Sequence, residues 1–419
     1  MKKLFAWLCM VALFAALVVC GAVAFLYQRA SLGDVPPAQV QFAGQELEPN
    51  GYSWGVPVLG GVLYRTFEQS STLTVQDLGV LATASPSLTL GEGLPAGACR
   101  LTVTGPGGGI VYEGSAEGFA QASLPQNGAY EVLLTAGRVK TGEKPAQPIG
   151  FYRYKFRFTL SVEPTLTLSA AELPRGGVFA VYVSGVLDQG VQPTAQCGLG
   201  QVWFAPWAGG WLGFVPVAYN AEAGAHPLTV TVGTRTLTAE LTVRHRDFAK
   251  VETTEEESAT PDGAAQQFRD KIWPLYTTGA PEVRWSGAFT TPVEGKVALD
   301  YGVYEYVNGS KGAQRSSGVE FEAEQGSQVA CPAPGTVVFA DPLLLTGNTV
   351  VVDHGCGLKS YLYNLGSLSV SAGAQVAQGD TLGFVGSEHI NYELKIANKS
   401  IDPWDAWRGE GGLFYRPAQ

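Results

Sequence analysis

A histidine and an asparagine stand two positions apart in the stretch SEHINYELKIA, residues 387–397. This stretch has the composition of a β-strand, and residues i and i+2 of a strand point to the same face. His389 and Asn391 therefore converge, while Ile390 and Tyr392 turn the other way. A His-x-His at this spacing would supply two metal-site groups. With Asn391 in the second place, the pair is an altered metal site, a different kind of site or a polar strand edge.

The elements around this pair are short strands. From Trp285 onward the chain contains GKVALDYGVYEYVNG, GNTVVVDHG, KSYLYNLGSL and similar runs, with no long helical pattern between them. Upstream, AAQQFRDKIWPLY is a single helical stretch that Pro274 stops, and it follows a segment that is acidic and poor in apolar residues. We therefore expect an acidic linker with a short helix at 248–284 and a nearly all-β domain at 285–419.

Two further β modules precede the linker. Residues 30–162 alternate short apolar runs with turn signals, and YRYKFRFTL has the period of two that is typical of a half-buried strand. Residues 163–247 hold regularly spaced strands, beginning with PTLTLSAAELPRGGVFAVYVSG, as in an Ig-like sandwich. The fold class predicted for the whole chain is mainly β, with two β-sandwich modules ahead of the C-terminal domain.

The composition agrees with this class and excludes one kind of partner. An apolar fraction of 46% is ample for buried cores, and 53 Gly with 25 Pro suit many tight turns. The formal net charge is -10, and the chain has no cluster of Lys and Arg. Because phosphate binding needs such clusters, we expect no nucleic-acid partner.

The N-terminus predicts a membrane helix. Residues 4–27 carry no charge and, at about 1.5 Å per residue, are long enough to cross the hydrocarbon core of a bilayer. Lys2 and Lys3 would stay in the cytoplasm, which makes 1–29 a single-pass anchor and places the rest outside the cytoplasm. Cleavage after Ala22-Val23-Ala24, as in a signal peptide, is the competing interpretation. A lipoprotein signal ending at Cys20 is less favoured, because the bulky Val19 precedes it.

Of the remaining cysteines, Cys331 and Cys356 fall in the same predicted domain. A single bridge between them and a pair of buried free thiols are both open interpretations.

The C-terminal domain resembles the LytM domain of the M23 zinc peptidases, which cut peptide cross-links in bacterial cell walls. The resemblance covers 285–408 and is carried, in the family's order, by GVEFEAEQGSQVACPAPGTVVFA, GNTVVVDHGCGLKSYLYNLGSL, VSAGAQVAQGDTLGFVGS and HINYELKIANKSIDPWDAW. The module that opens with PTLTLSAAELPRGGVFAV is similar to an Ig-like unit found ahead of some M23 domains. This resemblance implies a LytM-type β domain at the C-terminus.

The resemblance also implies that the metal site has been altered. The family binds zinc with H-x-x-x-D and the second His of H-x-H, and these positions hold Ser316, Glu320 and Asn391 here. Of the two further histidines that the family uses in catalysis, one is kept as His389 and the other is replaced by Asn364. Serine and asparagine are neutral, weak zinc ligands. We therefore expect no bound cofactor and a domain that is not an enzyme.

The predicted function is that of a membrane-anchored envelope protein whose M23-like domain binds peptidoglycan, a cell-wall hydrolase or another envelope protein. Tyr361 and Tyr363 are the binding candidates, since aromatic residues dominate many interfaces; the alternative places them in the core. An active zinc endopeptidase that cuts peptidoglycan cross-links remains the alternative function, with zinc as its cofactor. A LytM-type component of a sporulation channel is a further alternative.

Overall fold

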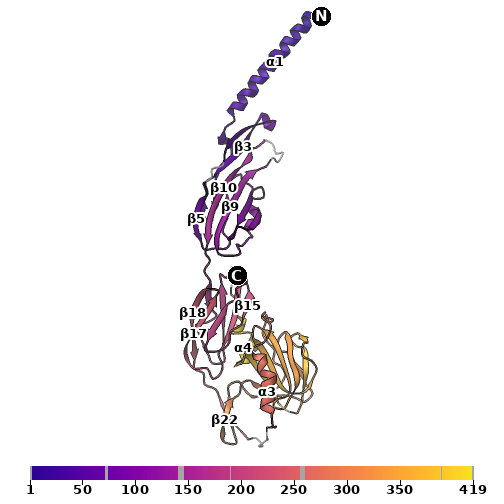
Figure 1. Cartoon of the computed structure of the whole chain (residues 1–419). Helices are drawn as coiled ribbons and strands as arrows, with labels where there is room; N and C mark the ends of the chain where they lie inside the picture. Colours follow the sequence, from indigo (N-terminus) through magenta and orange to yellow (C-terminus); the bar gives the residue numbers. More distant parts are fainter. Residues whose placement is uncertain are drawn as a thin grey trace. The chain divides into compact units, whose positions relative to one another are not determined.

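The computed structural model describes residues 2–70, 74–139, 146–188, 190–254, 260–387 and 389–417. The chain divides into two compact units, Met1–Glu163 and Pro164–Gln419 (Figure 1).

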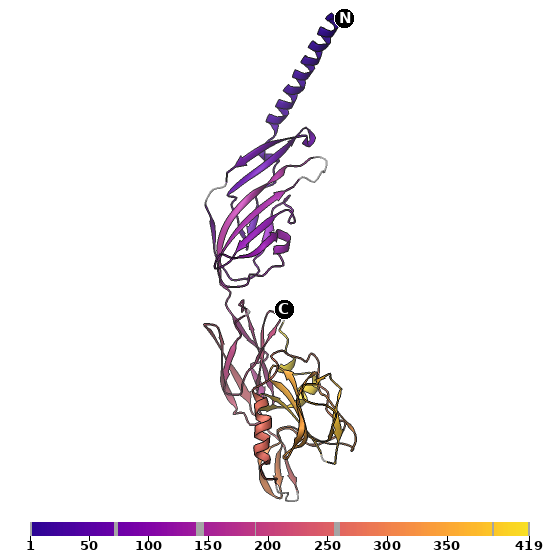
Figure 2. The same cartoon turned by 45° about the vertical axis from the view of Figure 1, so that its right-hand side comes forward.

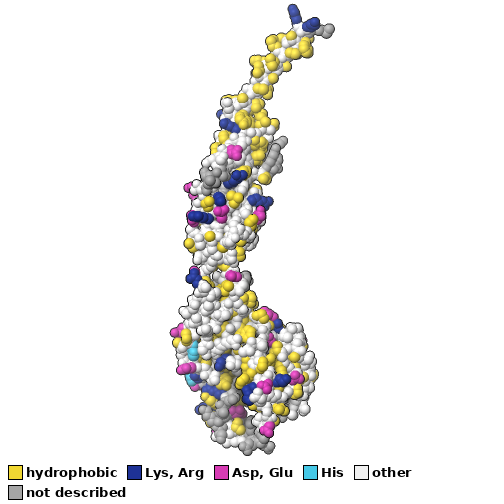
Figure 3. Space-filling view, in the orientation of Figure 1, with side chains coloured by type: hydrophobic (Ala, Val, Ile, Leu, Met, Phe, Trp, Pro, Cys, Tyr) yellow, Lys and Arg dark blue, Asp and Glu magenta, His cyan; other side chains and the backbone are white. Residues whose placement is uncertain are grey.

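The first unit begins with helix α1 (Lys2–Arg29), none of whose described residues is buried. It is long and apolar enough to cross a membrane, with a mean hydropathy of 2.7 in its most apolar window. Figure 3 shows hydrophobic side chains along α1 and basic side chains at its start. The helix is therefore compatible with either a membrane anchor or a signal sequence.

The rest of the first unit is β-structure, as predicted, and two of its sheets share a core. One sheet has the order β4-β3-β10-β9-β7-β8, with β5 pairing in parallel with β10, and the other has the order β2-β1-β6. The ring of Phe42 on β1 lies 4.8 Å from Phe156 and 5.5 Å from Phe158, both on β10. The predicted alternation of β10 is confirmed, because every second residue from Tyr154 to Leu160 is buried. The elements are η1 (Leu32–Asp34), β1 (Val40–Phe42), β2 (Gln45–Glu46), β3 (Gly51–Val58), η2 (Leu59–Gly61), β4 (Leu63–Gln69), β5 (Gln76–Leu81), β6 (Leu88–Leu90), β7 (Arg100–Thr104), β8 (Ile110–Ser115), α2 (Ala116–Phe119), β9 (Gly128–Arg138) and β10 (Ile149–Leu160).

The second unit opens with a sandwich of two sheets. Their orders are β11-β13-β16-β15 and β12-β18-β17-β14, and side chains from both fill the core between them. The strands are β11 (Thr165–Leu168), β12 (Glu172–Pro174), β13 (Val178–Ser184), β14 (Thr194–Cys197), β15 (Phe204–Trp207), β16 (Gly210–Pro216), β17 (Gly224–Val232) and β18 (Arg235–Arg244).

A second sheet system forms the C-terminal part of this unit (Figure 2). Its main path runs β20-β23-β30-β27-β26-β25-β28, with β24, β29 and β31 attached at the side, and β19-β21-β22 form a separate small sheet. The elements are β19 (Lys250–Thr253), α3 (Ala264–Ile272), η3 (Trp273–Tyr276), β20 (Lys296–Leu299), β21 (Tyr304–Val307), β22 (Ser310–Arg315), β23 (Val319–Glu322), β24 (Gln328–Ala330), β25 (Gly335–Leu343), β26 (Gly347–Gly355), β27 (Leu358–Leu368), β28 (Gln375–Val376), β29 (Thr381–Val385), β30 (Ile390–Ile396), β31 (Lys399–Ile401), α4 (Pro403–Arg408) and η4 (Gly412–Phe414).

Strands β13 and β16 join the sandwich to the C-terminal sheet. Phe179 and Val181 of β13 point into the sandwich core, whereas Ala180 and Tyr182 belong to a core that also contains C-terminal residues such as Trp285. A strand buried on both faces has a continuous apolar run, and VFAVYV in β13 is such a run. The sandwich core and the core beneath the C-terminal sheet therefore share one sheet.

Cys331 and Cys356, for which the sequence left both a disulfide and free thiols open, are free and buried. Cys331 Sγ lies 3.0 Å from the carbonyl oxygen of Ala333, while Cys356 Sγ lies 3.3 Å from that of Trp203, in the sandwich. Burial raises the pKa of each thiol to about 12. The bridge is not formed in this structure, and Cys356 instead contacts the sandwich.

We predict that Trp285→Ala destabilises the sandwich and the C-terminal sheet together. The Trp285 indole is buried, lies 5.4 Å from the Phe214 ring of β16, and donates to the Leu413 carbonyl at 3.0 Å. Replacing a buried aromatic residue with alanine costs about 3–5 kcal/mol. Urea unfolding monitored by hydrogen exchange should show β16 and β27 losing protection at the same, lower urea concentration. His226→Ala, at a half-buried position on β17 that belongs to neither of these cores, is the control. Loss of protection confined to β27 would contradict the prediction.

Candidate functional site

Three strands bring the predicted site residues into one row. Glu320 on β23 pairs with Asn391 on β30, and Asn391 pairs with Tyr363 on β27. Residues directly opposite each other in antiparallel strands project to the same face of the sheet. Glu320, Asn391 and Tyr363 therefore share the face that lies opposite the large core, to which Ile390 and Tyr392 belong.

His389 joins this row from the residue that precedes β30. Its Nδ1 lies 2.6 Å from Oε1 of Glu320, and the two side chains are 47% and 29% exposed. The amide oxygen of Asn391 is buried and has no hydrogen-bond partner within the described part of the chain. A carboxylate, an imidazole and a neutral amide therefore lie together at this end of the sheet.

Ser316 and Asn364 make other contacts. The Ser316 hydroxyl donates to the carbonyl oxygen of Gly318 at 2.8 Å. Asn364 has a positive φ of 63° at a bulge in β27, and its backbone N–H donates to Thr346 at 2.9 Å. Asparagine tolerates this left-handed conformation better than most residues, which gives Asn364 a backbone role.

The residues present do not fit a catalytic zinc ion. Such an ion takes three nitrogen, sulfur or carboxylate ligands and keeps one position open for water. Ser316 and Asn391 offer neutral oxygens, and an oxygen of Glu320 is already bonded to the His389 ring. In the described ranges, which omit Glu388, no three His, Cys, Asp or Glu side chains form a metal-binding group.

A buried ion pair continues the same face along β30. The Lys395 ammonium lies 2.6 Å from Oε2 of Glu393, which also accepts a hydrogen bond from the Tyr363 hydroxyl at 3.0 Å. The Ser317 hydroxyl donates to Oε1 of Glu393. Burial acts to raise the pKa of Glu393, but Lys395 and these donors lower it overall, while Glu393 raises the pKa of Lys395. Both groups are therefore held in their charged forms.

Helix α3 and η3 cover this face (Figures 1 and 2). Ile272 is fully buried in a cluster with Tyr361 and Tyr363, and the rings of Phe268 and Tyr276 lie 6.4 Å from Tyr363 and 6.1 Å from Tyr361. Tyr361 is 0% and Tyr363 5% exposed. In this conformation the two tyrosines form a core with the chain's own helix and are not an exposed binding surface.

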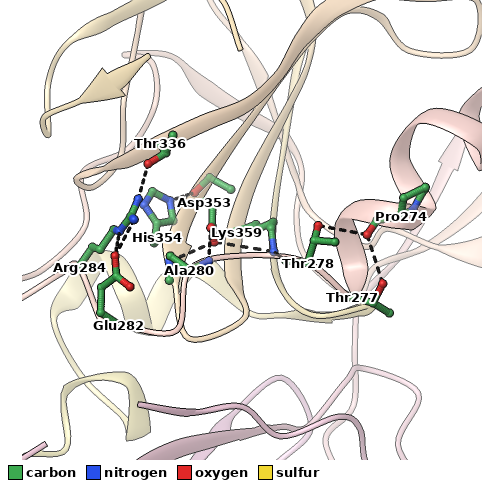
Figure 4. Close-up of polar contacts among 12 residues, drawn as sticks. Pro274, Thr277, Thr278, Ala280, Glu282, Arg284, Thr336, Asp353, His354 and Lys359 are labelled. Carbon is green, nitrogen blue, oxygen red and sulfur yellow. Dashed lines mark hydrogen bonds and ion pairs between the residues drawn. The ribbon is translucent and has the colours of Figure 1, made fainter. Parts of the chain in front are cut away.

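A second buried ion pair fastens the segment that follows η3 (Figure 4). Asp353 on β26 lies 3.7 Å from Lys359 on β27, and its other oxygen accepts the Ala280 N–H at 2.8 Å. Lys359 in turn donates to the carbonyl oxygen of Thr278 at 2.5 Å. The covering segment is thus tied to the sheet by backbone hydrogen bonds from charged side chains, which are stronger than neutral ones.

His354 is a structural residue. It is fully buried, with Nδ1 2.8 Å from the Pro334 carbonyl oxygen and Nε2 2.8 Å from the Ser360 hydroxyl. Burial lowers its pKa to about 4, so the ring is neutral at physiological pH.

Sequence analysis missed the two buried ion pairs. The sequence contains a signal for the Glu393–Lys395 pair, because these two residues continue the polar alternation that starts at Asn391. Such an alternation normally indicates a face in water, and only the covering helix turns it into a buried network.

Comparison with known proteins defines the class of this domain. The model of peptidase family M23 matches residues 314–403. The chain is 31% identical over 131 residues to the cell division protein DipM of Caulobacter vibrioides, a match that covers 28% of this chain and 20% of DipM. It is 33% identical over 138 residues to the murein hydrolase activator EnvC of Escherichia coli, covering 31% of this chain and 30% of EnvC.

A crystal structure of a putative M23 peptidase from Pseudomonas aeruginosa is also similar, at 21% identity and a TM-score of 0.44, over 56% of this chain and 94% of that one. The two sequence matches each span less than a third of the length of the relative, DipM or EnvC. Residues 314–403 are a peptidase M23 domain of the LytM type.

We predict that the purified chain binds less than one equivalent of zinc, because two of its three ligand positions are neutral. The triple change Ser316→His, Glu320→Asp and Asn391→His restores the family's ligand types and should raise the zinc content. Elemental analysis after dialysis measures both. One equivalent of zinc in the unchanged chain, lost in Glu320→Ala but kept in His226→Ala, would contradict the prediction.

Proposed function

We propose that this chain is a membrane-anchored protein of the bacterial cell envelope whose M23 domain binds peptidoglycan without cleaving it. The observation that carries the proposal is the donor set, in which Glu320 is hydrogen-bonded to His389 and stands beside the neutral Asn391. Without a bound zinc ion, nothing lowers the pKa of an attacking water towards 7. A lone general base such as His389 contributes only about 10²–10⁴-fold, which is far too little for amide hydrolysis.

The covered sheet face supports the same proposal. Phe268, Ile272 and Tyr276 occupy the face beside the altered site, and the Asp353–Lys359 pair fastens the segment behind them. A substrate strand crossing that face would have to displace this apolar contact. EnvC is named as a murein hydrolase activator, and this supports a binding role for a related domain.

Anchoring by α1 is the second part of the proposal. The helix has the length and hydropathy of a membrane span, with Lys2 and Lys3 before its apolar run and Arg29 at its end. The excess of positive charge at the start favours a cytoplasmic position for that end. The β-structure would then lie outside the cytoplasm, where peptidoglycan is found.

We expect the full-length chain in detergent to sediment with purified sacculi and to release no peptides from them. Chromatography of the supernatant measures release, and a wall-cleaving enzyme confirms that the sacculi can be cut. The matched variant carries Ser316→His, Glu320→Asp, Asn364→His and Asn391→His. Chelator-sensitive release by the unchanged chain would make it an enzyme. Failure to sediment with sacculi would contradict the peptidoglycan part and favour a protein partner.

We expect α1 to remain on the mature protein, because the apolar run continues through Phe25, Leu26 and Tyr27 beyond Ala24. Protease added to cells stripped of their walls should digest the region after Arg29 and leave the N-terminal segment with the membrane. Immunoblotting with a tag before Met1 and a tag after Gln419 follows the two ends. A mature protein that begins at Phe25 would show that α1 is a cleaved signal sequence.

A further inference from the structure

A cavity of about 570 Å³ opens between three parts of the second unit. Gln201 comes from the sandwich, just before β15, and Ala397 and Asn398 come from the turn between β30 and β31. Trp273, Tyr276 and Thr277 of η3 and the residue after it complete the lining. The cavity is separate from Glu320, His389 and Asn391, and its volume is within the range of about 300–1,000 Å³ that is typical of small-molecule sites.

Two aromatic rings dominate this cavity. Trp273 is 54% exposed, whereas Trp211 and Trp285 of the same unit are buried, and an exposed side chain of this size is an informative feature of a surface. Tyr276 is packed on its inner side, because its ring lies 6.1 Å from that of Tyr361 and its ring centroid lies 5.6 Å from the ammonium of the buried Lys395. The exposed indole thus stands beside a ring that the neighbouring core supports.

The backbone around the two rings is also constrained. Pro274 follows Trp273 and fixes the backbone at the start of η3, and its carbonyl oxygen accepts the hydroxyls of Thr277 at 3.3 Å and Thr278 at 3.2 Å (Figure 4). On the opposite wall, Ala397 has a positive φ of 50°, and its N–H donates to Gly357 at 3.0 Å. The cavity is therefore largely formed before any ligand binds, which lowers the entropic cost of binding.

The polar groups of the lining are all uncharged. Gln201 and Asn398 carry exposed primary amides, each of which can donate and accept hydrogen bonds, and Thr277 adds a hydroxyl. No Lys, Arg, Asp or Glu is among the lining residues. A charged peptide would leave its ionic groups without partners here, whereas a hydroxylated ligand would find both an apolar face and adaptable amides.

We propose that this cavity binds an uncharged saccharide of the N-acetylhexosamine class. The C–H face of a sugar ring stacks on the indole of Trp273, and the hydroxyl and acetamido groups bond to the amides of Gln201 and Asn398. Aromatic side chains suit this role because they combine a large apolar face with little conformational entropy to lose. The proposal rests on the proposed envelope function, and it names the sugar strand of the wall, not its peptide, as the part that the chain recognises.

The test is a calorimetric titration of the full-length chain in detergent with tetra-N-acetylchitotetraose. A stem peptide of the wall, without sugar, is titrated in parallel. Trp273→Ala should weaken saccharide binding at least tenfold, Trp273→Phe should restore part of it, and Asn398→Ala should weaken it less. Leu344→Ala is the matched control, since Leu344 is also 54% exposed but does not line the cavity. Unchanged thermal unfolding of Trp273→Ala excludes a folding defect.

Saccharide binding that depends on Trp273 and is indifferent to Leu344 supports the proposal. It is overturned if the unchanged chain does not bind the saccharide at millimolar concentration, if Trp273→Ala binds as tightly, or if the stem peptide binds in a Trp273-dependent way. Sedimentation with sacculi keeps the two proposals apart. Sedimentation that persists in Trp273→Ala leaves the envelope function standing without this site, whereas peptide release from sacculi contradicts that function whatever the saccharide does.

Discussion

The double burial of β13 and β16 is the constraint on which the second unit depends. Each strand presents one face to the sandwich core and the other to the core beneath the C-terminal sheet, where Phe214 meets Trp285. Neither face can be exposed without a loss of about 25 cal/mol for each Å² of apolar surface. The sandwich and the M23 domain are therefore mutually stabilising.

The opposite face of the C-terminal sheet combines apolar contacts with buried ion pairs. Two buried ion pairs, Asp353–Lys359 and Glu393–Lys395, lie beneath α3, η3 and the segment that follows them. Buried charges add little net stability, because their desolvation offsets their attraction, but they penalise any arrangement that leaves one of them unpaired. They fix where the covering segment lies, and the apolar contacts of Ile272 supply the stabilisation.

The candidate site and the cavity beside the sandwich lie on the same scaffold. The strand register aligns Glu320, Asn391 and Tyr363 on one face. Register depends on backbone pairing and on the apolar face of each strand, so it persists when individual polar side chains change. The covering segment closes this sheet face and at the same time places Trp273 at the cavity beside the sandwich.

The sequence by itself determined the β class, the apolar N-terminal helix and the M23 resemblance, because each of them is visible in local periodicity or in short motifs. It could not determine that Tyr361 and Tyr363 are buried or that Glu393 and Lys395 form an ion pair. Those outcomes depend on α3, which lies about a hundred residues earlier in the chain and packs on the sheet only in the folded state. Strand alternation states which side chains share a face, but only tertiary packing decides whether that face meets water or another element.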